Sequence, residues 1–155
     1  MQPPSPFFPL ALLLVLGVVA CDGLLPEVGP AQLARCSNSD SDPATSHSFE
    51  ADLRPIIERQ SAGCGEGCHH PGGRNPVGVA LGGLDLSSYA SLRLGGAQTG
   101  SSIIVTGQPC ESLLLKKLGP TPPFGARMPL NGPPFLSAAE LQDLNDWIAE
   151  GAPEQ

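Results

Sequence analysis

Glycine and proline set the limits of this fold, because they divide the chain into short pieces. The 155 residues include 19 glycines and 18 prolines, and aromatic residues make up 5%. Neither glycine nor proline is well tolerated inside a helix or a central strand. A domain of roughly one hundred residues buries only about 60–68% of its unfolded surface. We therefore expect a small all-α domain with long loops, and a core so thin that another group fills its middle.

Two internal stretches have the pattern of a helix. Residues 48–60, "SFEADLRPIIERQ", place apolar side chains at helical spacing, but Pro55 should kink this helix or lie in its first turn. Residues 109–118, "PCESLLLKKL", begin with proline, end in two lysines and are followed by Gly119. We expect one helix in each stretch.

Two shorter pieces are less regular. Residues 88–92 predict a short helical turn that follows Ser87 as its cap and ends before Gly95. The piece "SIIVTG" at residues 102–107 is a candidate strand, but its side chains do not alternate well enough to build a sheet. The remaining stretches are expected to be loops.

The last helix has the clearest boundaries. Ser137 and Glu140 form a Ser-x-x-Glu capping box, and Gly151 supplies a left-handed stop. Between them one face is apolar. We expect Trp147 from this face to pack with Phe49 where the first and last helices cross.

The N-terminus has the features of an export signal. Residues 1–20 contain no charged side chain, and residues 7–20, "FFPLALLLVLGVVA", are apolar. The run is shorter than the about 20 residues that a membrane span needs, and it ends on a small residue, as export cleavage requires. "VVAC" resembles the lipobox of bacterial lipoproteins, in which Cys21 is lipidated, although residues 1–6 lack the usual Lys or Arg. A buried core helix is the alternative for this segment.

These features divide the chain into three parts. We predict a lipoprotein signal peptide at residues 1–20, a lipidated N-terminus and flexible tether at residues 21–47, and the folded domain at residues 48–152. The lipid would hold the exported domain on a membrane of the cell envelope, in the periplasm. The net charge of −7 disfavours nucleic acid and favours docking to basic patches on another protein.

The stretch "AGCGEGCHHPGG" concentrates thiols and imidazoles. It contains Cys64, Cys68, His69 and His70, although the whole chain has five cysteines and three histidines. A haem held by two thioethers needs two neighbouring cysteines and a histidine directly after the second, which then reaches the iron. Three residues rather than the usual two separate these cysteines, and the glycines between them can absorb the extra residue in a bulge. The pattern predicts a covalent haem c on Cys64 and Cys68, with His69 on its iron.

A cytochrome of this kind usually needs a second axial ligand. Met1 leaves with the signal peptide, so Met128 is the methionine that remains in the mature chain. It lies in "PTPPFGARMPLNGPP", where Pro129 restricts it to extended backbone angles. A lone methionine is more often a filler of gaps in a core, but these surroundings are not core-like. Met128 is therefore the candidate distal ligand, and His47 is the alternative.

Residues 48–151 resemble a cytochrome c domain, in particular the planctomycete-type cytochrome c domains found in exported proteins. Five pieces in this order carry the resemblance: "ADLRPIIERQSAGCGEGCHHPG", "GGLDLSSYASLRLGG", "GQPCESLLLKKL", "ARMPLNG" and "LSAAELQDLNDWIAEGA". The resemblance implies one covalent haem with His69 proximal and Met128 distal. It also implies single-electron transfer between a protein donor and a protein acceptor. No catalytic residue and no site for a small-molecule substrate is evident, so the expected protein is an electron carrier and not an enzyme.

Two cysteines are left over by this assignment. Cys36 and Cys110 are expected to form a disulfide, because leftover cysteines of exported proteins generally pair. This disulfide would tie the tether to the start of the helix at residues 109–118.

Other polar groups near the motif are expected to have ordinary structural or supporting roles. We expect His70 to be a solvated neighbour, because adjacent side chains diverge. Tyr89 is expected to be an ordinary half-buried tyrosine, with a hydrogen bond to a haem propionate as the alternative. A backbone carbonyl of Pro71 or Pro76 is the candidate partner for the second ring nitrogen of His69.

Two other classes of protein remain open. One is a structural zinc site built from Cys64, Cys68 and His69 or His70. The other is an exported binding module without a cofactor, in which Cys64 and Cys68 form a disulfide. The second alternative leaves Met128 and the histidines without a role.

Overall fold

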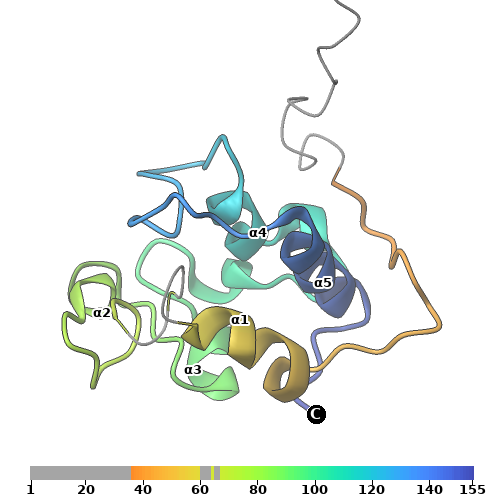
Figure 1. Cartoon of the computed structure of the whole chain (residues 1–155), viewed down its shortest axis with the longest axis horizontal. Coiled ribbons are helices and arrows are strands. Elements are labelled where there is room, and N and C mark those ends of the chain that lie inside the picture. Colours follow the sequence, from red (N-terminus) through yellow and green to blue (C-terminus); the bar gives the residue numbers. More distant parts are fainter. Residues whose placement is uncertain (1–35, 60–63, 65–66) are drawn as a thin grey trace, which may run out of the picture.

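The computed structural model describes residues 36–59, 64 and 67–155, and every regular element in them is helical. Figure 1 shows the elements around one core. Their bounds are η3, a π-helical turn (Phe49–Leu53), α1 (Arg54–Glu58), α2 (Val77–Gly82), α3 (Tyr89–Leu94), the 3-10 turns η4 (Gly100–Ile103) and η5 (Pro109–Glu111), α4 (Leu113–Leu118) and α5 (Ala138–Ala149). The expected all-α class is confirmed for this part of the chain. The candidate strand at residues 102–107 is absent from it, because η4 occupies the start of that stretch.

The first helical segment changes type at Pro55. Ser48 caps η3 by accepting a hydrogen bond from the N–H of Ala51, and Pro55 then lies in the first turn of α1. Proline has no N–H to donate to a preceding turn, so it is best tolerated where a new α-helix begins. The expectation that Pro55 would kink the segment or lie in a first turn is confirmed.

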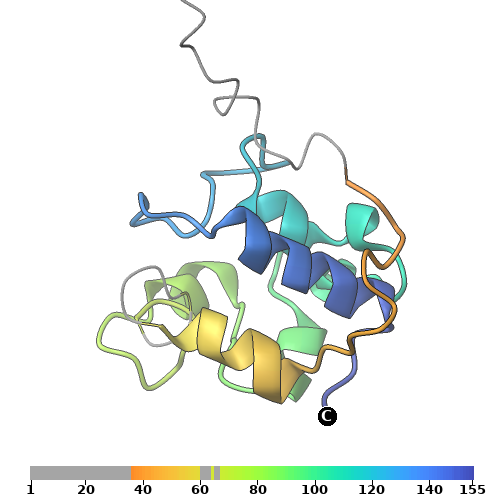
Figure 2. The ribbon, with the colours of Figure 1, turned by 45° about the vertical axis from the view of Figure 1, so that its right-hand side comes forward.

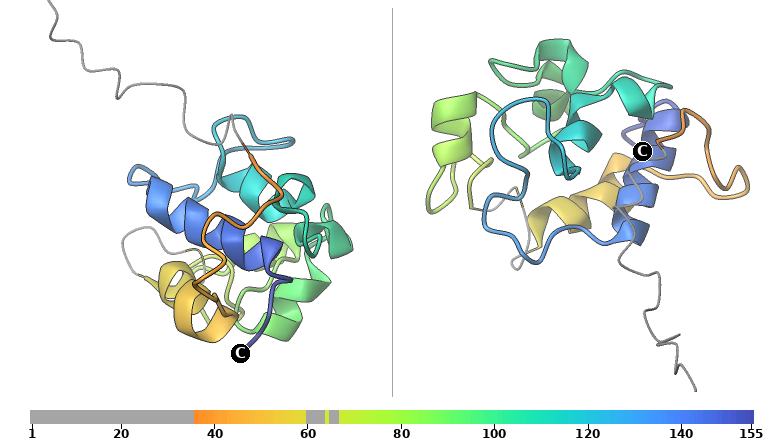
Figure 3. Two further views of the ribbon diagram at one scale, coloured as in Figure 1. Left: turned by 90° about the vertical axis from the view of Figure 1, so that its right-hand side faces the viewer. Right: turned by 90° about the horizontal axis from the view of Figure 1, so that it is seen from above.

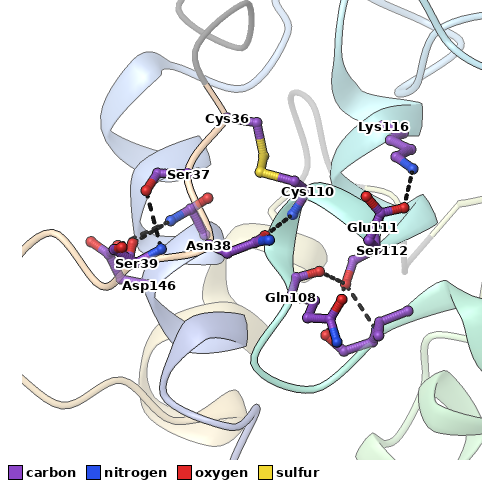
Figure 4. The surroundings of a disulfide bond; sticks show 12 residues. Cys36, Ser37, Asn38, Ser39, Gln108, Cys110, Glu111, Ser112, Lys116 and Asp146 are labelled. Atoms are coloured by element: carbon purple, nitrogen blue, oxygen red, sulfur yellow. Dashed lines mark hydrogen bonds and ion pairs between the residues drawn. A yellow bond between two sulfur atoms is a disulfide. The ribbon is translucent and has the colours of Figure 1, made fainter.

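We predicted a single helix at residues 109–118, and this prediction is wrong. It divides into η5 and α4 at Ser112, whose backbone is extended and whose side chain is fully buried. The Ser112 hydroxyl accepts a hydrogen bond from the N–H of Val105 at 2.8 Å and donates to the carbonyl of Gln108 at 3.1 Å (Figure 4). These local bonds compete with continued helix, which serine side chains commonly do.

Two further expectations need correction. Ser88, and not Ser87, caps α3, and it forms a reciprocal capping box with Ser91. Helix α2 lies in a stretch that we had assigned to a loop. Its sequence "VGVALG" has two glycines, and Pro76 before it makes no side-chain cap bond, so the usual helix signals are missing.

The core is centred on the contact between η3 and α5. The rings of Phe49 and Trp147 are both fully buried, with their centroids 6.3 Å apart. Tyr89 stacks edge-on against Phe49, and its hydroxyl donates to the carbonyl of Ala152 at 2.7 Å. The capping box of Ser137 with Glu140 and the positive φ of Gly151, 108°, are present as expected. Trp147 and Phe49 are thus confirmed as core residues.

The segment at residues 36–47 lies along α5, as Figures 2 and 3 show. Cys36 is joined to Cys110 by a disulfide, and the side chain of Asn38 accepts a hydrogen bond from the N–H of Cys110 (Figure 4). Ser41 donates through both its N–H and its hydroxyl to the carboxylate of Asp146. The last part of the predicted tether is therefore in contact with the helical domain from Cys36 onward.

The expected signal peptide and Cys21 lie outside the described residues. Within residues 36–59, 64 and 67–155, the longest helices are too short or too polar to cross a bilayer.

His47 connects this segment to the end of α5. Its Nδ1 lies 2.7 Å from a carboxylate oxygen of Glu150, and its backbone N–H donates to the other oxygen at 2.6 Å. Burial alone would lower the pKa of His47, but Glu150, with Asp143 and Asp52 nearby, raises the pKa above its ordinary value. The alternative in which His47 acts as an axial ligand is therefore not supported, because the ring is already paired.

This pairing predicts a pH-dependent contribution to stability. Because the folded pKa is raised, the contribution is complete below the unfolded pKa of about 6.5 and is lost as the pH rises through the folded value. His47→Gln should therefore lower the free energy of unfolding more at pH 6 than at pH 8.5, as measured by urea denaturation. An equal loss at both pH values would contradict the ion pair. His70→Gln, a change in an exposed turn, is the control.

Candidate functional site

The cysteine segment is held between α1 and α2 by backbone hydrogen bonds. The N–H of Cys64 donates to the carbonyl of Ile57 at 2.9 Å, which fixes the segment on the end of α1. The N–H of His69 donates to the carbonyl of Cys64 at 2.9 Å and so links these two residues. On the other side, the N–H of Val79 in α2 donates to the carbonyl of Cys68 at 3.1 Å. The two thiols and the imidazole thus belong to one backbone-bonded unit.

The imidazole of His69 has a fixed tautomer. Its Nδ1 lies 3.0 Å from the carbonyl oxygen of Leu84, and a carbonyl can only accept, so Nδ1 carries the proton. The lone pair is therefore on Nε2, the nitrogen that remains for a metal ion. We had expected a carbonyl of Pro71 or Pro76 in this role, and Leu84 supplies it instead.

Glycine at position 78 creates the space for this ring. A Cβ on Gly78 would lie 2.5–2.7 Å from three ring atoms of His69, which is closer than non-bonded atoms approach. The imidazole therefore lies directly against the backbone of α2. The backbone of His69 is anchored as well, because its carbonyl accepts from the N–H of Leu86 at 2.7 Å. The ring is held from both sides before any ligand binds.

Cys64 and Cys68 are both free thiols and both partly exposed. Burial raises the pKa of the Cys64 thiol to about 11, and the nearby charge of Cys68 acts in the same direction while Arg59 opposes it. Cys64 is therefore a neutral thiol at neutral pH. No disulfide joins the two, as the stapled-module alternative would require.

The zinc alternative also lacks support in this geometry. Zinc takes thiolate ligands, and four protein ligands are usual at a structural site. Cys36 and Cys110 are in a disulfide, and the part of the chain that the structure describes has no group of three His, Cys, Asp or Glu side chains arranged for a metal ion.

The loop at residues 119–136, which carries Met128, is tied to the end of α4. The N–H of Met128 donates to the carbonyl of Lys117 at 2.9 Å. The ammonium of Lys117 donates at 2.6 Å to the carbonyls of both Phe124 and Ala126, and burial lowers its pKa. Arg127 donates to the carbonyl of Leu118 at 2.7 Å. Two basic side chains therefore shape the loop from inside.

The Met128 loop and the cysteine segment lie at the same end of the molecule. In Figures 1 and 2 and in the right panel of Figure 3, residues 67–84 and residues 119–136 share the end opposite residues 36–47. Met128 and Cys64 are both partly buried against the same hydrophobic core. The structure thus gathers Cys64, Cys68 and His69 in one unit and puts the Met128 loop at the same end.

The other candidates are elsewhere or have local roles. His47 is paired with Glu150, and Tyr89 is bonded to Ala152, so neither faces this unit as a free ligand. The Nδ1 of His70 accepts a hydrogen bond from Gly72 at 3.0 Å in an exposed turn. His70 is thus a surface neighbour of the unit.

Sequence reasoning missed Leu84, Gly78 and Lys117, which position the site residues. A backbone carbonyl carries no sequence signal, and Gly78 is one of many glycines. Lys117 was expected only as a basic residue in the last turn of a helix, but its ammonium donates to two carbonyls of the loop that follows.

No protein-family model, curated protein or solved structure matches this chain. Function must therefore be argued from the site residues and their chemistry.

The contact between His69 and Gly78 can be tested directly. Gly78→Ala should displace the imidazole, break its hydrogen bond to Leu84 and cost about 1–3 kcal/mol of stability, because the site is already in close contact. NMR signals of the His69 ring and of Leu84 should shift, and urea denaturation measures the cost. Gly82→Ala in the same helix is the matched control, since a Cβ there meets nothing within 4 Å. Equal effects of the two changes would contradict the contact.

Proposed function

We propose that this chain is a mono-haem c-type cytochrome that passes single electrons between protein partners at the cell envelope. Cys64 and Cys68 would hold the haem through thioether bonds, and His69 would be the proximal ligand of its iron. A lipid on Cys21 would anchor the protein to a membrane. On this proposal the protein is an electron carrier and has no catalytic residue.

One observation carries the proposal: His69 directly follows a free thiol, and its Nδ1 is already held by the Leu84 carbonyl. A ligating imidazole generally donates its second N–H to a carbonyl or carboxylate, which fixes the ring and raises its basicity. The bond to Leu84 meets this requirement before any iron is present, and the Gly78 contact restrains the ring.

The thiols also fit this group. A thioether sulfur is uncharged, so a partly buried site with a raised thiol pKa suits it better than it suits a thiolate ligand. The two cysteines belong to one turn with His69, as attachment to two vinyl groups of one porphyrin demands. When bound, the haem supplies the one-electron chemistry, and the chain supplies its ligands, orientation and shielding from water.

Met128 is the proposed distal ligand. Its loop is at the same end of the molecule as the cysteine segment, and its backbone is tied to α4 through Lys117 (Figure 1). A thioether ligand and an apolar environment both favour reduced iron, which would raise the reduction potential.

Haem attachment is tested by expression with a cytochrome c maturation system, followed by a pyridine haemochrome spectrum. The wild-type chain should carry one haem that survives acid-organic extraction. Cys64→Ser and Cys68→Ser should each lose most of it, because one thioether is removed, and His69→Ala should lose the low-spin spectrum. His70→Ala is the control and should leave both unchanged. Wild-type protein that is folded but colourless would refute the proposal.

The distal ligand is tested separately with Met128→Ala. This variant should retain covalent haem but lose the sulfur-to-iron charge-transfer band of the oxidised protein, and its potential should fall. Leu130→Ala, an exposed position in the same loop, is the matched control. An unchanged band in Met128→Ala would remove Met128 from the ligand set and leave the haem proposal intact.

A further inference from the structure

Residues 36–47 cross the surface of the domain without packing into its core. We call this segment, "CSNSDSDPATSH", the strap; it contains no Leu, Ile, Val, Met, Phe, Tyr or Trp. None of its residues is buried, and most of them are exposed. A segment of this composition buries too little apolar surface to be held in place by the hydrophobic effect. The strap is therefore held on the domain by individual bonds.

The strap is fixed at its two ends in different ways. Its first residue, Cys36, is joined to Cys110 of η5 by a disulfide. Its last residue, His47, is bonded to Glu150 at the end of α5 through Nδ1 and through its backbone N–H. A hydrogen bond competes with water and contributes little net free energy, whereas a disulfide opens only by a chemical reaction. Cys36 is thus the permanent point of attachment.

The other hydrogen bonds of the strap to the domain follow Cys36 in the sequence. The side chain of Asn38 accepts from the N–H of Cys110, and Ser41 donates to the carboxylate of Asp146 in α5 (Figure 4). These bonds align the strap along α5 (Figure 2). They cannot limit the part of the chain that precedes Cys36. The disulfide alone therefore determines where the tether ends.

The position of the disulfide sets an upper limit on the reach of the tether. Cys36 lies fifteen positions after Cys21, and His47 lies twenty-six positions after it. Because an extended chain spans at most about 3.3–3.6 Å per residue, a tether that ran to His47 would reach at most about 90 Å, whereas one that ends at Cys36 reaches at most about 50 Å. The disulfide thus removes nearly half of the reach that the predicted tether would allow.

We propose that the Cys36–Cys110 disulfide is a device that limits how far the folded domain can move from the membrane. It ends the free tether at Cys36, and the strap that follows moves with the domain. The limit acts from a lipid on Cys21, so the inference rests on that part of the proposed function.

This limit bears on the kind of redox partner that the protein can meet. The cysteine segment and the Met128 loop lie at the end of the molecule opposite the strap (Figures 1 and 3). They belong to the folded domain and therefore share its restricted distance from the bilayer. The partner that fits this geometry is a protein bound to the same membrane, or one that diffuses next to it.

The test compares two insertions of twenty-four Gly and Ser residues in the full lipidated chain. One insertion lies between residues 30 and 31, before the disulfide, and the other lies between Cys36 and Ser37, inside the loop that the disulfide closes. Neutron reflectometry measures the mean height of the protein layer above a supported bilayer. The first insertion should raise this height by about 13 Å, because the end-to-end distance of a flexible chain is about 5–6 Å times the square root of its length. The second insertion should leave the height unchanged.

The control places the second insertion in a chain with both Cys36→Ser and Cys110→Ser. The height should now rise, because no covalent bond bypasses the inserted residues, and circular dichroism checks that the domain is still folded. If this variant does not fold, the two insertions with both cysteines present still decide the question. An equal rise for those two insertions would overturn the inference, as would no rise for the first.

Mass spectrometry of the N-terminal peptide separates this result from the proposed function. An unacylated Cys21 would refute the lipid anchor, and the inference with it. Acylated protein that rises equally with both insertions would refute the inference alone. The height of the layer does not depend on haem, so a colourless protein with the expected heights would refute the cytochrome proposal and leave the role of the disulfide standing.

Discussion

The hydrogen bond from the His69 ring to the carbonyl of Leu84 links the two halves of the candidate site. It joins the turn that carries the thiols to the chain that leaves α2, and it can form only because residue 78 is glycine. A buried or half-buried imidazole without such a partner would carry the cost of an unsatisfied donor. With it, the ring has one tautomer and one orientation, and Nε2 is left as the free nitrogen. Every role that we assign to the cysteine segment depends on this arrangement.

The rest of the fold supplies the support for this unit. Phe49 and Trp147 pack where η3 meets α5, and the disulfide of Cys36 with Cys110 holds the N-terminal segment on the far side. The core therefore forms mainly from η3, α4 and α5, while α2 contributes no buried residue. A domain of this size has little stability to spare. On our proposal, a covalent cofactor adds apolar contacts at the end where the chain's own side chains are fewest.

The elements that follow local rules could be predicted from the sequence. The capping box of Ser137 and the first-turn position of Pro55 depend on residues within one turn, and both were expected. The capping residue of α3 and the break at Ser112 were not, because neighbouring serines compete as caps and Ser112 bonds to Val105, seven residues away. Helix α2 was not predicted, because its two glycines disfavour a helix and no side chain caps its N-terminus.

Part of the candidate site could likewise be predicted from the sequence, and part could not. Cys64, Cys68 and His69 are recognisable from their spacing, and the leftover cysteines, Cys36 and Cys110, are joined in the structure. The groups that position them were beyond sequence reasoning, because a carbonyl is common to all residues and the Gly78 contact depends on how α2 folds back.

The central claim is that two thiols of one turn hold a haem whose iron is bound by the imidazole beside them. The most direct measurement is mass spectrometry of the peptide that spans residues 60–74, obtained by cleavage after Arg59 and Arg74 in protein exported alongside a cytochrome c maturation system. The account predicts a peptide that carries one haem on Cys64 and Cys68 and that reductant does not release. A peptide with two unmodified thiols, or with a Cys64–Cys68 disulfide, from well-folded protein would contradict it.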